Sequence, residues 1–261
     1  MKRWAWAGML LGAVLTLALF APAAWMAAAV NDATGHRLML SDARGTVWNG
    51  SAVLVLTGGA GSRDASALPG RLQWTLGLDG LALSLRARQP CCMPEAVALR
   101  LVPALGRFRV EWPAGAGKPR LLGQWPAAWL VGLGTPWNTL HPTGTLALRS
   151  EGFVVESVQG RWAFQGHAEL ELRSMASSLS TLDMLGNYRL SLQGQARGEA
   201  ALLKLSTDSG VLQLGGQGQW LGSGLRFQGQ ASAAPGSEAV LSNLLNIIGR
   251  RQGALTIISI G

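Results

Sequence analysis

Alternation of apolar and polar residues runs through most of the chain after residue 31 and constrains its fold more than any other feature. In LQWTL (72–76) the three apolar residues face one way, and Gln73 and Thr75 face the other. The same period of two recurs at 81–88, 169–173, 188–193, 202–206, 211–215 and 225–229. Such alternation predicts half-buried β-strands, which Gly-, Pro- and Asp-containing turns separate. We therefore predict a mainly β, antiparallel protein whose sheet has one apolar face.

Few segments have the pattern of a helix. The clearest is 237–249, where Ser237 is placed to cap the N-terminus, Glu238 suits its positive end and Gly249 is placed to end it. Pro126–Leu133 is a shorter candidate. With so few helices, the apolar face must be covered by a second sheet, by curling of the same sheet, or by another apolar partner. The first solution is a sandwich, and the second is a barrel or trough.

The first thirty residues predict a membrane anchor. Lys2 and Arg3 precede an uncharged run, and Trp6 to Trp25 covers about 28 Å as a helix, close to the thickness of the hydrocarbon core. Trp4 and Trp6 at one end and Trp25 at the other are placed as membrane-interface anchors. The basic N-terminus predicts a cytoplasmic start and a translocated main domain. The alternative is a cleaved signal peptide.

Weak internal repeats predict two tandem β-units. Three helical segments lead to a strand that runs from Gly to Ser: GHRLMLS (35–41), GTLALRS (144–150) and GALTIIS (253–259). Two further pairs of similar segments share one offset, since 166 − 50 = 116 and 186 − 70 = 116. We expect an anchor at 1–30, a first β-unit at 31–143, and a second at 144–261 that includes the C-terminal helix and strand.

The sequence has no recognisable catalytic constellation. The three histidines (His36, His141 and His167) lack the spacing of metal ligands, the acidic residues are dispersed, and no nucleophile, phosphate-binding or dinucleotide motif occurs. We predict no enzyme activity, no cofactor and no metal. The formal net charge is +8, but the arginines are scattered and no recognition helix is present, so nucleic-acid binding is not expected.

The adjacent cysteines Cys91 and Cys92 lie between Pro90 and Pro94, in a loop between predicted strands. Outside the cytoplasm they would meet an oxidising environment. One interpretation is a vicinal disulfide that stiffens the loop, and the alternative is a redox or partner-linking role.

Four segments together resemble the type II secretion system protein N family, also called general secretion pathway protein N. They are the N-terminal run ending in PAAW, ARGTVWNGSA (43–52), LPGRLQW (68–74) and LLNIIGRRQGALTIISIG (244–261). The resemblance implies a single-pass inner-membrane protein of a Gram-negative bacterium with a periplasmic β-domain. It also implies an accessory part in exporting folded proteins across the outer membrane. A more distant similarity to AsmA-like proteins implies a curved sheet with an apolar trough.

Two hypotheses follow from the residues and the resemblance. In the first, the chain binds other inner-membrane secretion subunits and the outer-membrane secretin. The apolar terminal strand, with Ile257, Ile258 and Ile260, is then the candidate partner edge. In the second, the apolar groove of the sheet holds membrane lipid.

Overall fold

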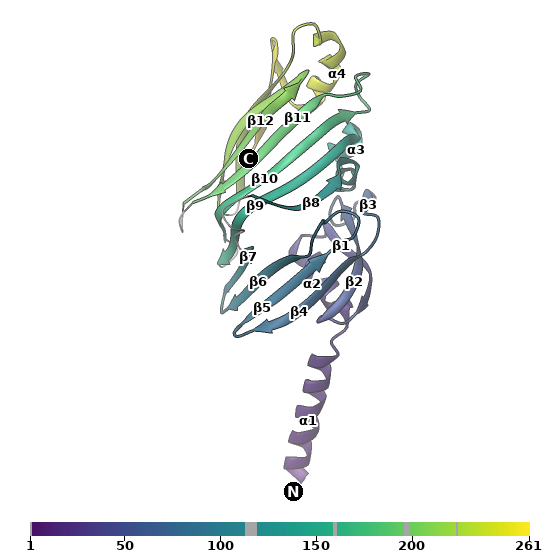
Figure 1. Ribbon diagram of the computed structural model, residues 1–261, viewed down its shortest axis with the longest axis vertical. Helices are drawn as coiled ribbons and strands as arrows, with labels where there is room; N and C mark the ends of the chain where they lie inside the picture. The colour runs from purple at the N-terminus through teal and green to yellow at the C-terminus, as the bar shows by residue number, and fades with distance from the viewer. Residues whose placement is uncertain (1, 113–118, 159–160, 196–198, 223) are drawn as a thin grey trace.

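The computed structural model describes residues 2–112, 119–158, 161–195, 199–222 and 224–261. Its strands form one 16-stranded sheet in which every pairing is antiparallel, in the order β1-β2-β4-β5-β6-β7-β9-β10-β11-β12-β13-β14-β16-β15. β3 pairs with β2, and β8 pairs with β9. Figure 1 shows a long curved sheet with one helix projecting from the end that holds the N-terminus. The predicted mainly β, antiparallel fold with few short helices is confirmed.

The first part of the sheet contains eight strands, several of which coincide with the alternating segments. They are β1 (Leu38–Gly45), β2 (Asn49–Thr57), β3 (Ala65–Ala67), β4 (Leu72–Asp79), β5 (Ala82–Arg88), β6 (Val97–Ala104), β7 (Arg107–Trp112) and β8 (Arg120–Pro126).

The second part continues the same sheet, because β9 pairs with β7. Its strands are β9 (Pro142–Val158), β10 (Arg161–Ser177), β11 (Gly186–Gly194), β12 (Ala201–Gly210), β13 (Leu212–Leu221), β14 (Gly224–Ala233), β15 (Arg250–Gln252) and β16 (Leu255–Ile260). The helices are α1 (Lys2–Leu19), α2 (Ala23–Ala33), η1 (Ala127–Leu133), α3 (Trp137–Leu140) and α4 (Glu238–Ile248).

The N-terminal segment differs from the single anchor helix that we predicted. α1 ends at Leu19 and α2 begins at Ala23, with Pro22 between them in an extended conformation. Proline lacks the amide hydrogen that a continuous helix needs there, so the expected helix from Trp6 to Trp25 is broken. All three tryptophans are exposed, but they lie on different helices. Trp4 and Trp6 lie on α1, and Trp25 lies on α2, which packs against the sheet. Within the described residues, no helix combines the length and the apolar character needed to span a membrane.

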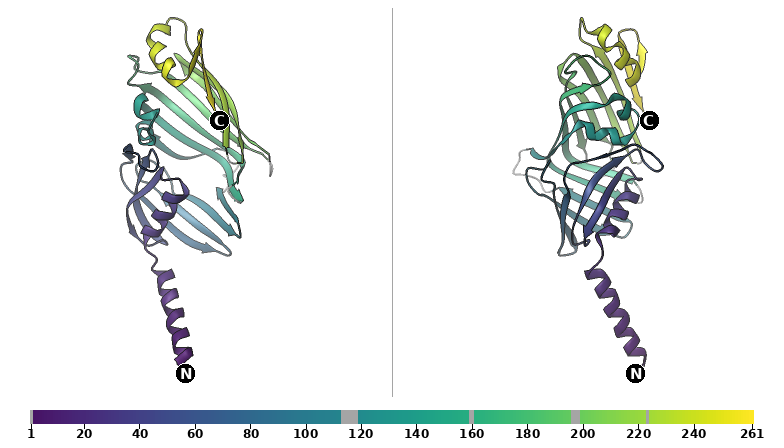
Figure 2. Two further views of the ribbon diagram at one scale, coloured as in Figure 1. Left: turned by 180° about the vertical axis from the view of Figure 1, so that it is seen from behind. Right: turned by 90° about the vertical axis from the view of Figure 1, so that its right-hand side faces the viewer.

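Two helices cover the two ends of the apolar face of the sheet. α2 packs Ala23 against Leu40, Ala52 and Trp74, all of which are buried. α4 buries a stripe of three leucines, Leu241, Leu244 and Leu245, against the last strands. The predicted boundaries of α4 agree with the structure: Ser237 occupies the N-cap without a side-chain capping hydrogen bond, and Gly249 follows the last turn. Figure 2 shows α2 and α4 far apart along the molecule.

The strands that follow α2 and η1 have a common arrangement. β1-β2-β4-β5 and β9-β10-β11-β12 each form an antiparallel meander in chain order. In each, the pairing of the first two strands is irregular just after the serine that ends the repeated Gly-to-Ser segment, Ser41 in one and Ser150 in the other. The two meanders thus share a local feature, and the division into two β-units at 31–143 and 144–261 stays a prediction.

Candidate functional site: the inner face and the terminal edge of the sheet

One face of the sheet, called the inner face here, is apolar across its whole width. From the first part into the second, a row of directly opposed residues crosses five strands: Leu83, Leu101, Val110, Val155 and Phe164. In the second part, a longer row crosses seven strands: Leu148, Leu170, Leu190, Leu205, Gly216, Gly229 and Ile258. Directly opposed side chains lie on the same face of a sheet. The alternation in the sequence therefore builds one continuous apolar surface.

The inner face is concave. The rings of Phe164 on β10 and Trp220 on β13 lie 5.5 Å apart, centroid to centroid. In a flat sheet, strands three places apart would be separated by about 14 Å. The amide of Trp162 also donates a hydrogen bond of 3.0 Å to the carbonyl of Gly222, which joins β10 to the β13–β14 turn. The second part of the sheet thus curls toward its inner face, as the two views in Figure 2 show.

Aromatic side chains line the middle of the inner face. Trp112 and Phe153 have ring centroids 6.3 Å apart, Phe153 and Phe164 are 5.9 Å apart, and Phe164 continues to Trp220. Phe153 is buried, and the other three are half-buried. Helices α2 and α4 pack on the two ends of the face, away from this row. The contacts of these four residues depend on the curl of the sheet, so the local sequence pattern does not indicate them.

The opposite, outer face is polar and carries ion pairs between neighbouring strands. Arg149 lies 2.9 Å from Glu171, and Arg189 lies 3.5 Å from Glu169 and 3.1 Å from Asp208. Each of these carboxylates faces a guanidinium, an arrangement that suits a solvated sheet surface. Within the described part of the chain, no group of three or more His, Cys, Asp or Glu could hold a metal ion.

Two hollows of the surface are lined by both polar and apolar residues. One of about 550 Å³ is lined by Arg44, Arg86 and Arg88 together with uncharged side chains. The other, of about 1140 Å³, is lined by residues of β11 to β14 and β16: Lys204, Arg226, glutamines, serines, glycines, three leucines and Ile257. Among the described residues, neither lining contains a carboxylate.

Among the described residues, the pKa values of Asp42 and Tyr188 are clearly displaced. Hydrogen bonds from the guanidinium groups of Arg71 and Arg44 lower the pKa of the exposed Asp42. Burial raises the pKa of the Tyr188 phenol, whose oxygen has no hydrogen-bond partner among the described residues. Tyr188 packs in the core beneath α4 and is therefore a structural residue.

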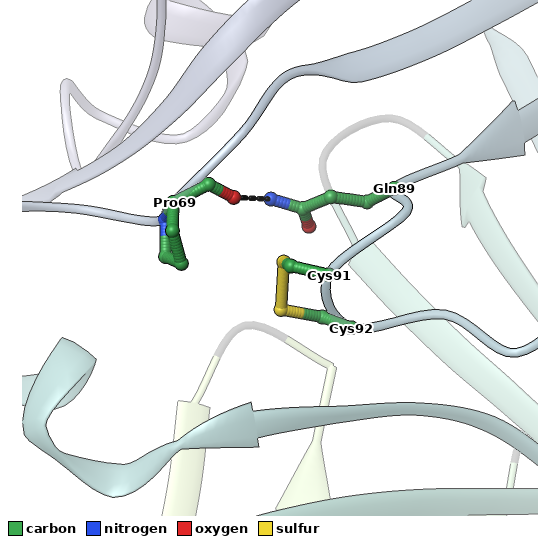
Figure 3. Close-up of a disulfide and its surroundings, with 4 residues drawn as sticks. All are labelled: Pro69, Gln89, Cys91 and Cys92. Carbon is green, nitrogen blue, oxygen red and sulfur yellow. Dashed lines mark hydrogen bonds between the residues drawn. A yellow bond between two sulfur atoms is a disulfide. The ribbon is translucent and has the colours of Figure 1, made fainter.

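The cysteine loop lies between the turn before β4 and strand β8. Cys91 and Cys92 form a disulfide, and the loop lies against the turn before β4 (Figure 3). The buried amide of Gln89 donates a hydrogen bond of 3.5 Å to the carbonyl of Pro69, and the carbonyl of Cys92 accepts one of 2.7 Å from the amide of Gln124. Cys92 is buried but Cys91 is exposed, so the stiffened loop and the redox or partner-linking role both stay predictions.

The terminal strand is close to the edge of the sheet. β16 pairs with β14 from Thr256 to Ile260 on one side, and β15 pairs with it from Leu255 to Ile257 on the other. Among the described strands, none pairs with the outer side of Ile258–Ile260. Ile258 faces inward and packs near α4, Ile257 is half-buried, and Ile260 is exposed. The three isoleucines named from the sequence thus differ in exposure, and Ile260 is the accessible one.

The comparisons with known proteins identify a family. The model of the type II secretion system protein N family matches residues 36–257. The match covers all strands from β1 to β15 and half of β16, and leaves α1 and α2 outside. No curated protein and no solved structure matches the chain.

Proposed function

Because the chain belongs to the type II secretion system protein N family, we propose that it is an accessory subunit of that system and supports export of folded proteins across the outer membrane. It acts by binding other subunits and catalyses no reaction. The family match over residues 36–257 carries the proposal. The ion-paired carboxylates of the outer face and the apolar inner face support a role in binding.

The proposed location is the inner membrane, with the N-terminus in the cytoplasm and the β-domain in the periplasm. Apolar side chains along α1, including Met9, Leu11, Val14 and Leu17, are exposed in the structure. A helix that exposes apolar groups in this way is unfavourable in water and needs lipid or protein around it. The uncharged run of the sequence and its basic start support lipid and this orientation.

The proposed contact with other secretion subunits, the outer-membrane secretin among them, is the open edge at Ile258–Ile260. Backbone amide and carbonyl groups at an open sheet edge can pair with a strand of another protein. Ile260 adds an exposed apolar side chain to this edge.

Deletion and complementation test the proposal. Cells that lack the chain should retain a secreted protein in the periplasm, and the wild-type chain should restore it to the medium. A variant with His36→Ala, His141→Ala and His167→Ala should restore secretion equally, since no step depends on these side chains. Unchanged secretion in the deletion strain would contradict the proposal, and failure of the histidine variant at normal abundance would point to chemistry.

A second candidate function is lipid handling, which the aromatic row on the inner face favours. Trp112, Phe164 and Trp220 are only half-buried although they lie on a concave apolar surface. Such a surface suits acyl chains of membrane lipid. Mass spectrometry of the chain extracted in mild detergent should then find bound phospholipid. A Phe164→Gln variant should lose this lipid, and Gln219→Ala on the outer face is the matched control.

A further inference from the structure

Three turns lie in a row at one end of the first part of the sheet. Asn49 of β2 is opposite Thr75 of β4, so the β1–β2 turn lies at the same end as the β4–β5 turn. Leu83 of β5 is opposite Leu101 of β6, which places the β6–β7 turn at this end too. Figure 1 shows these turns on the side of the sheet from which α1 projects.

The first of the three turns holds the end of α1. The indole nitrogen of Trp48 donates a hydrogen bond of 2.8 Å to the carbonyl of Ala18, and the amide of Val47 donates one of 2.8 Å to the carbonyl of Ala21. Pro22 also forms a β-bridge with Thr46. The position of α1 is therefore fixed relative to this end of the sheet.

The other two turns each expose a leucine side chain to solvent. Asp79 is opposite Ala82, which leaves Gly80-Leu81 as a two-residue loop, and Ala104 is opposite Arg107, which leaves Leu105-Gly106. Leu81 is 99% exposed and Leu105 is 106% exposed. Two-residue hairpin loops favour Gly, Asn and Asp. A solvent-exposed leucine does not stabilise such a loop.

Neighbouring side chains enlarge the apolar area. Leu78, just before the first loop, is 77% exposed, and Phe108, just after the second, is exposed as well. The two loops are separated by about two strand spacings, or roughly 10 Å. A single exposed leucine needs no explanation, but four large apolar side chains at adjacent turns mark an interaction surface.

We propose that these two loops, with Leu78, Leu81, Leu105 and Phe108, are a second membrane contact that dips into the surface of the bilayer beside α1. This inference rests on the proposed attachment of α1 to the membrane. The fixed contact between α1 and the β1–β2 turn brings the two leucine loops to the same bilayer surface. Arg100 and Arg107 lie just behind the loops, and each is paired with a carboxylate: Arg100 lies 3.5 Å from Asp79, and Arg107 lies 3.2 Å from Glu156. Together, α1 and the loops fix the tilt of the β-domain over the membrane.

Spin labels on the full chain in phosphatidylcholine bilayers test the proposal. Leu81→Cys and Leu105→Cys carry the label, and Asn246→Cys on α4, at the far end of the molecule, is the control. Cys91 and Cys92 are joined to each other and stay unlabelled without reductant. Oxygen concentrates in the hydrocarbon and a nickel chelate stays in water, so collisions with each report the depth of the label.

At positions 81 and 105 we expect frequent collisions with oxygen and loss of collisions with nickel, whereas position 246 should show the reverse. Nickel collisions at 81 and 105 as frequent as at 246, on a chain that stays with the bilayer, would overturn the contact and leave the α1 anchor standing. A label shielded from both reagents would show that these loops contact protein and not the bilayer, and would also overturn the membrane contact. A chain that separates from the bilayers would overturn the anchor and the loop contact together.

Discussion

Replacing Leu241 with alanine tests whether α4 is an integral part of the β-domain. The Leu241 side chain is 0% exposed and lies among Leu244, Leu245 and the strands beneath. Truncation of a fully buried leucine costs about 2–5 kcal/mol, because transfer free energy is lost and a cavity remains. That is a large share of the roughly 5–15 kcal/mol that separates a folded domain from its unfolded state.

The neighbouring Val240 supplies the matched control. It lies on the same helix but is 40% exposed, so Val240→Ala should change the free energy of unfolding by less than about 0.5 kcal/mol. Equilibrium urea unfolding of the full chain in detergent, followed by circular dichroism of the β signal, measures both variants. Equal unfolding midpoints for Leu241→Ala and Val240→Ala would refute the reasoning that α4 closes the core.

Three further outcomes follow from the described structure. Gly166→Ala should destabilise the domain by more than about 1 kcal/mol in urea unfolding, since φ of Gly166 is +92° and the new Cβ would overlap the carbonyl of Gly152. Gly215→Ala is the control and should be nearly neutral, because its new Cβ meets no atom within 4 Å. Tyr188 is the only tyrosine, and its raised pKa means that stability is complete below about pH 10 and declines as pH rises beyond. Its ultraviolet titration should therefore coincide with alkaline unfolding, and a reversible titration near pH 10 with the fold intact would contradict its burial. Reducing the Cys91–Cys92 disulfide should leave the urea midpoint almost unchanged, because joining adjacent residues closes a minimal loop, and a large shift would contradict a local role.

The alternation of apolar and polar residues predicted the strands, because successive side chains of a strand point to opposite faces and only one face of this sheet is apolar. The boundaries of α4 were also predictable, since Gly249 ends an apolar stripe of regular helical spacing. The break at Pro22 was not predicted, because the apolar run on both sides of the proline was interpreted as one membrane-spanning helix. The proline itself was the signal that the run contains two helices.

Two parts of the candidate surfaces could not be read from local pattern. The approach of Phe164 to Trp220 depends on how tightly the sheet curls, which is set by the sum of many strand twists. The surface formed by Leu81 and Leu105 could not be predicted without the strand register. Only the register shows that their two turns lie at the same end of the sheet. A leucine beside a turn glycine was the local signal.

Photocrosslinking from Ile260 in cells tests the central claim most directly, that the chain works in secretion by contact through its terminal edge. A photoreactive residue at Ile260, in a chain that restores secretion, should crosslink to another subunit of the type II secretion system. The same residue at Asn246, exposed on α4, serves as control and should give no such product. If Ile260 yields no product with any secretion subunit while secretion proceeds at normal chain abundance, the terminal edge is not the contact and the account is contradicted.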